Sequence, residues 1–450
     1  MSPASPSSFV SDPGTTLFPV VFVRPSTLAP AGCVLDSAVA EPHPEVTSPP
    51  MIRFRSSSPI RALTALSLAC ALLLQSVVAA AAPVLVPSPP RLAASSWILV
   101  DADTGRVIVE ENADEELPPA SLTKMMTDYI AAAEIEAGRI SLDDEVPISE
   151  RAWRTGGSKM FVRVGDRVRL EDLIRGIVIQ SGNDASVAVA EYIAGSEDAF
   201  ADLMNQQARL LGMERSSFRN ATGWPAEGHY SSARDLSILA RRIVQDFPEH
   251  YAFYSEREFT YGEDFQTGEP ITQRNRNDLL WLDQTVDGIK TGHTEEAGYC
   301  LVASAERDGM RLISVVMGTD STRARAQESQ TLLRYGFRFY ETVKVYAGGE
   351  ELERQQVWKG GAESVAVGLP EDLVLTLVRG RYEDVEATVT VEPWLTAPLA
   401  EGQEVGSLKV MLDDEVLHEG PLVVVEPVAE AGFLLRVWHS LYLFFAKLFS

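Results

Sequence analysis

Residues 118–127 read Pro-Pro-Ala-Ser-Leu-Thr-Lys-Met-Met-Thr and place Ser121 three positions before Lys124. The prolines end the preceding element. From Ser121 to Ala137 the chain has no Gly or Pro and is rich in Ala, Met and Glu, which predicts a helix. Ser121 then lies at the helix start, where the exposed N–H groups favour developing negative charge, and Lys124 lies one turn later on the same face. The pair predicts a serine nucleophile with a lysine base, although a serine N-cap beside a solvated lysine has the same spacing.

A lysine can take the proton of a serine hydroxyl only if its own pKa is lowered. Burial and a second cation both lower a lysine pKa, and Lys290 is the candidate cation. It begins Lys290-Thr291-Gly292, which precedes a predicted hairpin at 299–317 and is therefore expected on an edge strand.

Each residue of this edge strand has a predicted role. Lys290 and Thr291 offer a cation and a hydroxyl to a carboxylate. Gly292 lets substrate backbone approach closely, and the N–H of His293 is expected to pair with that of Ser121 as an oxyanion hole.

The second of the three motifs along the chain, Ser181-Gly182-Asn183, forms a polar break between the apolar residues 177–179 and a predicted helix at 183–194, and Lys290-Thr291-Gly292 is the third. We expect Ser181 to relay a proton between Lys124 and a leaving amine. We expect the amide of Asn183 to bind a substrate peptide bond. Helix capping is the ordinary alternative for both residues.

The surrounding pattern is α+β. Hairpins are predicted at 96–109 and 299–317, and helices at 121–137, 170–176, 183–194 and 322–343. We assign 92–343 to a catalytic domain and 344–427, where short apolar runs alternate with Gly and Pro turns, to a small all-β domain.

The last twenty residues differ from both domains. In 431–450 the polar residues Arg436, Ser440 and Lys447 share one helical stripe, with His439 beside it, and Leu, Phe, Trp and Tyr occupy the rest. This indicates an amphipathic helix at a membrane surface. A transmembrane span and a buried core helix are the alternatives.

The N-terminal region indicates export. Residues 51–82 combine arginines, an apolar run and a cluster of alanines, which is typical of a secretory signal cleaved near Ala81 or Pro83. Residues 1–50 are rich in Pro and Ser and are expected to be a disordered extension or a mis-annotated start before Met51. After cleavage Cys300 is the lone cysteine, and we expect a buried small hydrophobe rather than a disulfide or a reactive thiol.

Composition excludes other classes. The 450 residues carry a formal net charge of −25 and no basic patch, which argues against nucleic-acid binding. The six histidines show no H-E-x-x-H or comparable spacing, so no metal is expected.

Together the motifs resemble those of the serine D-alanyl-D-alanine carboxypeptidases, the low-molecular-mass penicillin-binding proteins. The resemblance rests on four stretches, 119–127, 181–185, 230–236 and 287–294. It implies a penicillin-binding-protein or serine β-lactamase-like catalytic domain, followed by a small all-β domain and a C-terminal amphipathic helix.

The resemblance also implies an activity. Ser121 is the implied nucleophile, Lys124 the proton acceptor, Ser181 the proton shuttle and Lys290 the substrate-binding cation. The implied reaction removes the terminal D-alanine of peptidoglycan stem pentapeptides through an acyl-enzyme, without cofactor, and β-lactams acylate the same serine. The implied location is the periplasmic face of the inner membrane, with 431–450 as a peripheral anchor.

Some alternatives stay open. Residues 220–225 resemble a variant of the family's substrate-side loop, which leaves the fine substrate specificity open. Trp224 either lines the cleft or has a plain packing role. A serine β-lactamase is disfavoured because Gly182 stands where a class A enzyme carries Asp and no deacylating glutamate can be placed. A D,D-endopeptidase is not excluded. An inactive wall-binding protein fits poorly with intact motif residues.

Overall fold

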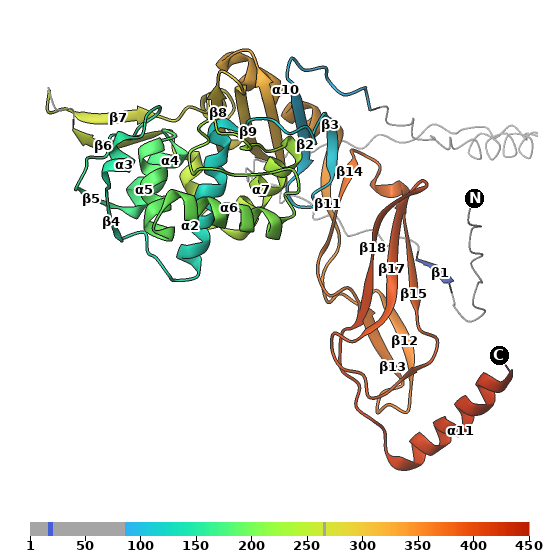
Figure 1. The fold of residues 1–450 in the computed structure, drawn as a ribbon. Coiled ribbons are helices and arrows are strands. Elements are labelled where there is room, and N and C mark those ends of the chain that lie inside the picture. Colours follow the sequence, from blue (N-terminus) through green and yellow to red (C-terminus); the bar gives the residue numbers. More distant parts are fainter. Residues whose placement is uncertain (1–16, 21–85, 264–266, 450) are drawn as a thin grey trace, which may run out of the picture. The chain divides into compact units, whose positions relative to one another are not determined.

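The computed structural model describes residues 17–20, 86–263 and 267–449 (Figure 1). The predicted signal at 51–82 lies outside the described residues. So does the N-terminal extension, except for the strand β1 (Leu17–Val20), which borders β15 in the C-terminal sheet.

A five-stranded antiparallel sheet forms the centre of the first domain, in the order β3-β2-β10-β9-β8. Its strands are β2 (Ser96–Asp101), β3 (Val107–Glu111), β8 (Val286–Thr294), β9 (Gly298–Arg307) and β10 (Met310–Thr319). Both predicted hairpins are confirmed, as β2–β3 and β9–β10. The strand that contains the Lys-Thr-Gly motif, β8, is at the edge of the sheet, as expected.

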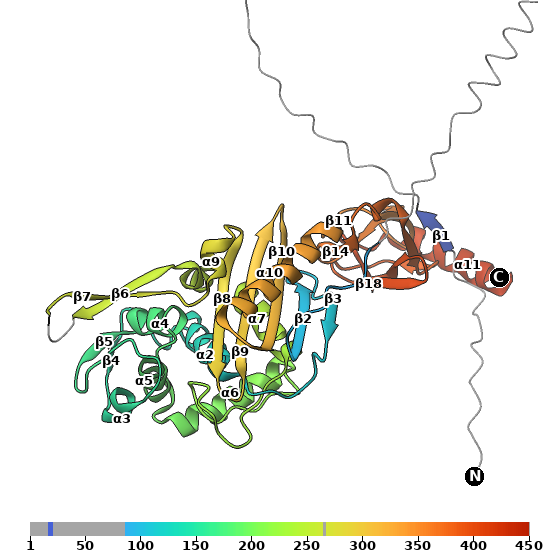
Figure 2. The ribbon, with the colours of Figure 1, turned by 90° about the horizontal axis from the view of Figure 1, so that it is seen from above.

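Both faces of the sheet are buried. Successive side chains of a strand point to opposite faces, so the residues of one strand contribute to two different cores. In β2, Trp97 and Leu99 join a core with α10 (Thr322–Phe339), whereas Ile98 and Val100 join the larger helical core on the other face. Figure 2 shows the helices on the two sides of the sheet.

The larger core is built by five helices: α2 (Lys124–Glu136), α4 (Leu170–Val178), α5 (Asn183–Ala194), α6 (Glu197–Leu211) and α7 (Ala233–Asp246). Shorter elements are η1 (Ala120–Thr123), α3 (Glu150–Arg154), α8 (Pro248–Tyr251), η2 (Ala252–Ser255) and α9 (Leu279–Leu282). Two small hairpins complete the domain, β4 (Glu145–Pro147) with β5 (Arg167–Arg169), and β6 (Glu258–Glu263) with β7 (Pro270–Arg274). Serine side chains cap four helix N-termini: Ser149, Ser196, Ser232 and Ser321.

The predicted helix 322–343 is too long. α10 ends at Phe339, and Tyr340–Tyr346 form β11, which pairs with β14 (Leu373–Val378). The β-branched residues Thr342, Val343 and Val345 favour an extended strand, and pairing with β14 overrides the helix.

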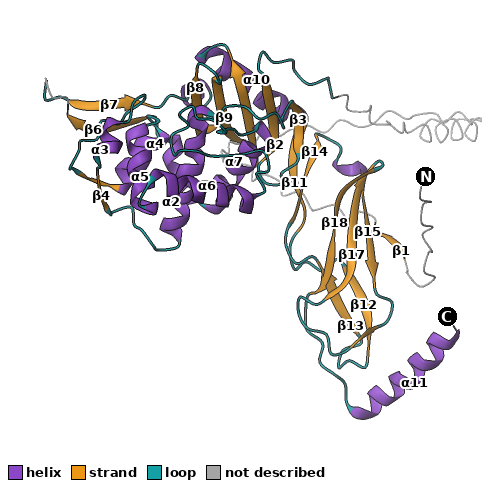
Figure 3. Cartoon of the chain, in the orientation of Figure 1, coloured by secondary structure: helices purple, strands orange, loops and turns teal. Residues whose placement is uncertain are grey.

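The rest of the second domain is all-β, as predicted, and Figure 3 shows strands and loops almost throughout this part of the chain. Its strands are β12 (Glu353–Trp358), β13 (Ser364–Gly368), β15 (Val385–Val391), β16 (Leu395–Thr396), β17 (Glu404–Leu412) and β18 (Glu415–Val424), with η3 at Tyr382–Asp384. The sheet order is β1-β15-β17-β18-β13-β12-β16.

A helix follows where the amphipathic pattern predicts one, α11 (Phe433–Phe449). Its apolar residues are largely exposed, with Phe433 at 70% and Leu434 at 83%. Among the described residues, no helix has the length and apolar character needed to span a membrane.

Candidate active site

The first two motifs meet at Lys124. Ser121 lies in η1, a tight turn that leads directly into α2, and Lys124 is the first residue of that helix. Its Nζ donates to Ser121 Oγ at 3.0 Å and to Asn183 Oδ1 at 2.8 Å, and Asn183 is the first residue of α5. The predicted nucleophile and base are therefore in direct contact.

The third motif packs against the turn that carries Ser121. A Cβ on Gly292 of β8 would lie 3.0 Å from the carbonyl oxygen of Pro119 and 3.3 Å from the Cβ of Ala120. These distances are tighter than most Cβ contacts, so glycine favours the close approach of β8 to this turn. The next residue, His293, is exposed, and its ring lies 4.0 Å from that of Tyr299. The geometry brings His293 and Ser121 to the same end of the site.

Lys124 is fully buried and has a third acceptor, the carbonyl oxygen of Thr222 at 2.5 Å. Burial, and next the positive charge of Arg276, lower its pKa from 10.5 to about 7. A large fraction of Lys124 is therefore neutral near pH 7, which is the form that can accept a proton.

Lys290 is also buried, and its pKa is well below 10.5. Burial is the main cause, and the charges of Lys124, Arg276 and Arg325 add to it. Its Nζ donates to the carbonyl oxygen of Thr291 at 3.1 Å. These lysines and arginines form a cationic cluster that can receive an anionic group.

Ser181 has an unusual setting. It adopts a positive φ of 65° between α4 and α5, and its buried hydroxyl has no hydrogen-bond partner among the described residues. Buried polar groups normally have partners, so this hydroxyl is free to bind a group of the substrate. In this structure Lys124 bonds to Asn183 rather than to Ser181.

The side-chain amide of Asn183 is already engaged. Oδ1 accepts from Lys124, and Nδ2 donates to the carbonyl oxygen of Gly156 at 2.7 Å. Its backbone N–H donates to the carbonyl oxygen of Ser158, also at 2.7 Å. Asn183 thus fixes both the base and the loop that follows α3, and its expected contact with substrate stays a prediction.

Sequence reasoning missed several groups at the site. Arg276 and Arg325 have no carboxylate within ion-pair distance among the described residues, and Arg325 donates to the carbonyl oxygen of Gly292 at 3.1 Å. Asp184 accepts from the N–H groups of Met160 and Phe161 at 3.0 and 2.9 Å. The two arginines lie in no recognisable motif. Asp184, however, directly follows one and could have been found there.

The remaining chemical candidates are few. Cys300 is buried on β9, as expected, and burial raises the pKa of its thiol to about 11. In the described part of the chain, no group of three or more His, Cys, Asp or Glu residues is placed to hold a metal ion.

Comparisons with known proteins identify the family of this chain. Residues 84–321 match the family described as D-alanyl-D-alanine carboxypeptidase, and 340–430 match the C-terminal domain of penicillin-binding protein 5. The Escherichia coli D-alanyl-D-alanine carboxypeptidase DacC is 43% identical over 369 residues, which cover 80% of this chain and 90% of that protein.

Solved structures support the fold. Penicillin-binding protein 5 from Haemophilus influenzae is 40% identical, with a TM-score of 0.71 over 76% of this chain and 100% of that one. The ampicillin-bound penicillin-binding protein D2 from Listeria monocytogenes is 29% identical, with a TM-score of 0.50 over 56% of this chain and 100% of that one. The expected catalytic domain with a following β domain is confirmed, and the chain belongs to the D-alanyl-D-alanine carboxypeptidase family.

Proposed function

We propose that Ser121, Lys124, Ser181 and Lys290 carry out the reaction of this serine D-Ala-D-Ala carboxypeptidase, and that its substrates are peptidoglycan stem pentapeptides. One observation supports this most directly. The Nζ of a buried lysine with a pKa of about 7 lies 3.0 Å from the hydroxyl of Ser121.

In the acylation step, neutral Lys124 takes the proton of Ser121 as Oγ attacks the carbonyl carbon of the penultimate D-alanine. The N–H groups of Ser121 and His293 stabilise the resulting oxyanion. The C–N bond then breaks, and the proton passes from Lys124 through the Ser181 hydroxyl to the departing D-alanine amine. The free hydroxyl of Ser181 supports this relay.

Deacylation reuses the same groups. A water molecule gives its proton to Lys124 and attacks the ester carbon. The ester bond breaks, and the proton returns to Ser121 Oγ. The shortened peptide leaves with a new carboxyl group, which loses its proton to solvent, and the enzyme returns to its starting protonation state.

The cationic cluster suits the C-terminal carboxylate of the substrate. Burial and mutual repulsion favour the neutral form of Lys290 in the free enzyme. An arriving carboxylate offsets that repulsion and favours the charged form of Lys290, with which it can form an ion pair. Thr291, which is buried beside it on β8, adds a hydroxyl donor.

The same serine is the proposed target of β-lactams. Attack of Ser121 on the lactam carbonyl opens the ring and leaves an acyl-enzyme. Structures of the Listeria relative in ampicillin-bound and cefotaxime-bound forms support this assignment.

We assign α11 to a membrane surface on the periplasmic side. Most of its apolar residues are exposed in the described structure, including Trp438 at 65% and Phe444 at 65%, whereas Leu443 is buried. Exposed aromatic and aliphatic side chains on one helix favour burial at the headgroup boundary of a bilayer. The signal predicted at 51–82 agrees with export.

The test is release of free D-alanine from diacetyl-Lys-D-Ala-D-Ala by the full-length chain in detergent, with covalent capture of a fluorescent penicillin in parallel. Ser121→Ala is the control. Release and capture that both disappear in the variant support the proposal. Capture without release favours an endopeptidase, and rapid penicillin turnover favours a β-lactamase.

A further inference from the structure

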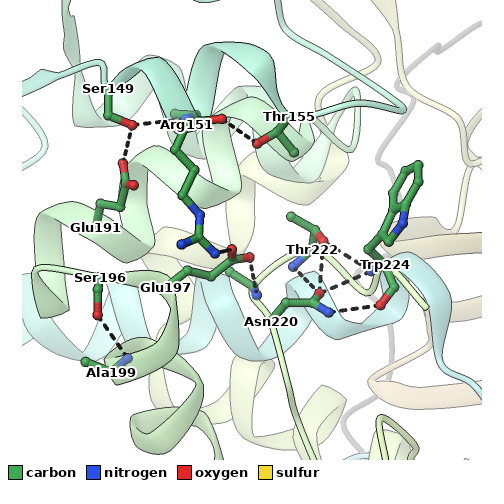
Figure 4. A network of polar contacts seen from close by, with 12 residues as sticks. Ser149, Arg151, Thr155, Glu191, Ser196, Glu197, Ala199, Asn220, Thr222 and Trp224 are labelled. Carbon is green, nitrogen blue, oxygen red and sulfur yellow. Dashed lines mark hydrogen bonds and ion pairs between the residues drawn. The ribbon is translucent and has the colours of Figure 1, made fainter. Parts of the chain in front are cut away.

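The third acceptor of Lys124 belongs to a tightly fixed turn, Asn220–Trp224 (Figure 4). Oδ1 of Asn220 accepts from the N–H groups of Thr222 at 3.1 Å, Gly223 at 2.8 Å and Trp224 at 3.1 Å. Its Nδ2 donates to the carbonyl oxygen of Trp224 at 2.9 Å. The turn is therefore closed on itself by one side chain.

Ala221, just before Thr222, is held from two sides. Its N–H donates to Glu197 Oε1 at 3.2 Å, and its carbonyl oxygen accepts from Thr127 of α2 at 2.7 Å. On the other side of Thr222, Gly223 packs against the carbonyl of Ala120. The Thr222 carbonyl thus lies between two fixed residues.

Glu197 also holds the second loop of the site. Its Oε2 pairs with Arg151 of α3 at 2.6 Å, and α3 leads into residues 155–158. Two carbonyl groups of that loop fix Asn183, the second acceptor of Lys124. Figure 4 shows Glu197 between Arg151 and the turn.

The two loops also touch each other directly. A Cβ on Gly157 would lie 2.9 Å from the indole of Trp224 and 2.6 Å from Nδ2 of Asn183. The loops are thus joined by Glu197 on one side and by the Trp224–Gly157 contact on the other. Glu197 is only 7% exposed, and it lies in the first turn of α6, where a carboxylate is favoured.

From this arrangement we infer that Glu197 is a positioning residue for the general base. By joining the two loops, it holds the Thr222 carbonyl and Asn183 at Lys124 and keeps water away from the lysine. The inference rests on the proposed role of Lys124. Glu197 does not touch the reacting atoms and acts through these loops.

The expected pH effect has a definite sign. The charged or titratable groups around Lys124 are Arg276, Lys290, Asp184 and His229, and none of them changes in the variants. Burial is the largest cause of the lowered pKa of Lys124. Loosened loops weaken the two acceptors of Lys124, which lowers its pKa, but they also admit water, which raises it. Because burial is the largest cause of the shift, we expect the increase to prevail, so that activity falls off at a higher pH as the solution is acidified.

The experiment uses full-length Glu197→Ala, Glu197→Gln and Arg151→Ala. It measures kcat and KM for diacetyl-Lys-D-Ala-D-Ala and the rate of penicillin acylation from pH 5 to 9. Arg154→Ala is the matched control, because Arg154 also lies on α3 and pairs with an exposed carboxylate, Glu150, at 2.6 Å. Melting temperatures confirm that each variant is folded.

We expect Glu197→Ala to lower kcat about tenfold at pH 7 with KM little changed. The acid limb of the pH–rate profile, where activity falls as the pH is lowered, should move to a pH higher by roughly half a unit or more. Glu197→Gln keeps an acceptor for Ala221 and should show a smaller effect, similar to Arg151→Ala. Arg154→Ala should match the wild type.

Folded variants with wild-type acylation rates and an unmoved acid limb would overturn the inference. If Glu197→Ala does not fold, the other two variants decide by the same criteria. A wild type without an acid limb near neutral pH would overturn the role of Lys124 itself. D-alanine release by Ser121→Ala would instead overturn the proposed function.

Discussion

Replacing Gly223 by alanine should disable the nucleophile while leaving the fold intact. Gly223 has a φ of 81°, and a methyl group there would overlap the carbonyl oxygen of Ala120, the residue before Ser121. Because the overlapping atom, 1.7 Å from the added methyl, is backbone, no side-chain rotation relieves it, and the turn must move by about 1.7 Å to reach ordinary contact. A misplacement of about 1 Å can lower a rate about 100-fold, so we expect acylation to fall by at least that factor.

Gly212→Ala is the matched control. Gly212 has a φ of 79°, and its added methyl group would meet nothing within 4 Å. Both variants therefore carry the left-handed backbone penalty of roughly 1–2 kcal/mol, and only Gly223→Ala adds the overlap. The assay is the rate of fluorescent-penicillin acylation, with the melting temperature measured for each protein. If folded Gly223→Ala acylated within a few fold of Gly212→Ala, the argument that this glycine sets the position of Ser121 would be refuted.

Further predictions concern charge and the C-terminal helix. Arg276→Ala removes a positive charge that lowers the pKa of Lys124, so the acid limb of kcat/KM should move to higher pH; an unmoved limb would exclude this coupling. Burial alone would lower the pKa of His250, but Asp128 raises it on balance. The pair should stabilise the fold below about pH 6.5 and lose that contribution as pH rises through the folded pKa, so the melting-temperature deficit of Asp128→Asn should shrink between pH 5 and 9. Truncation after Glu430 should abolish binding to phospholipid vesicles in a flotation assay and leave D-alanine release unchanged; a truncated protein that still floats would exclude α11 as the anchor.

The sequence predicts the parts of this molecule that depend on local pattern. The turns Asp103-Thr104-Gly105 and Asp308-Gly309, each between two apolar runs, indicate the two hairpins, and both form. The spacing of Ser121 and Lys124 is also local, because three residues along a helix return to the same face. The predicted end of α10, at residue 343, is wrong because Tyr340–Tyr346 pairs with β14. That strand lies about thirty residues further along the chain, and no local pattern reveals the pairing.

The environment of the base was only partly predictable. A backbone carbonyl such as that of Thr222 has no sequence signature, and the fold alone brings it to Lys124. A neighbouring cation was expected, with Lys290 as the candidate. The charge that most lowers the pKa of Lys124, after burial, comes instead from Arg276, which precedes α9 and lies in no motif.

The roles inside the second motif also depend on the fold. The sequence predicts a proton relay by Ser181 and a substrate contact by the amide of Asn183. Because Asn183 begins α5 beside the loop at 155–158, its amide is drawn into holding Lys124 and Gly156. Ser181, in a left-handed conformation just before it, keeps its hydroxyl free.

The most direct test of the central claim is to locate the acyl group. The full-length protein is incubated with a penicillin and quenched in acid, and the intact mass and the modified peptide are determined by mass spectrometry. The Ser121–Lys124 contact predicts one acyl group per chain, on Ser121, with none in Ser121→Ala. An acyl group on any other residue, or an undiminished adduct in Ser121→Ala, would contradict the account.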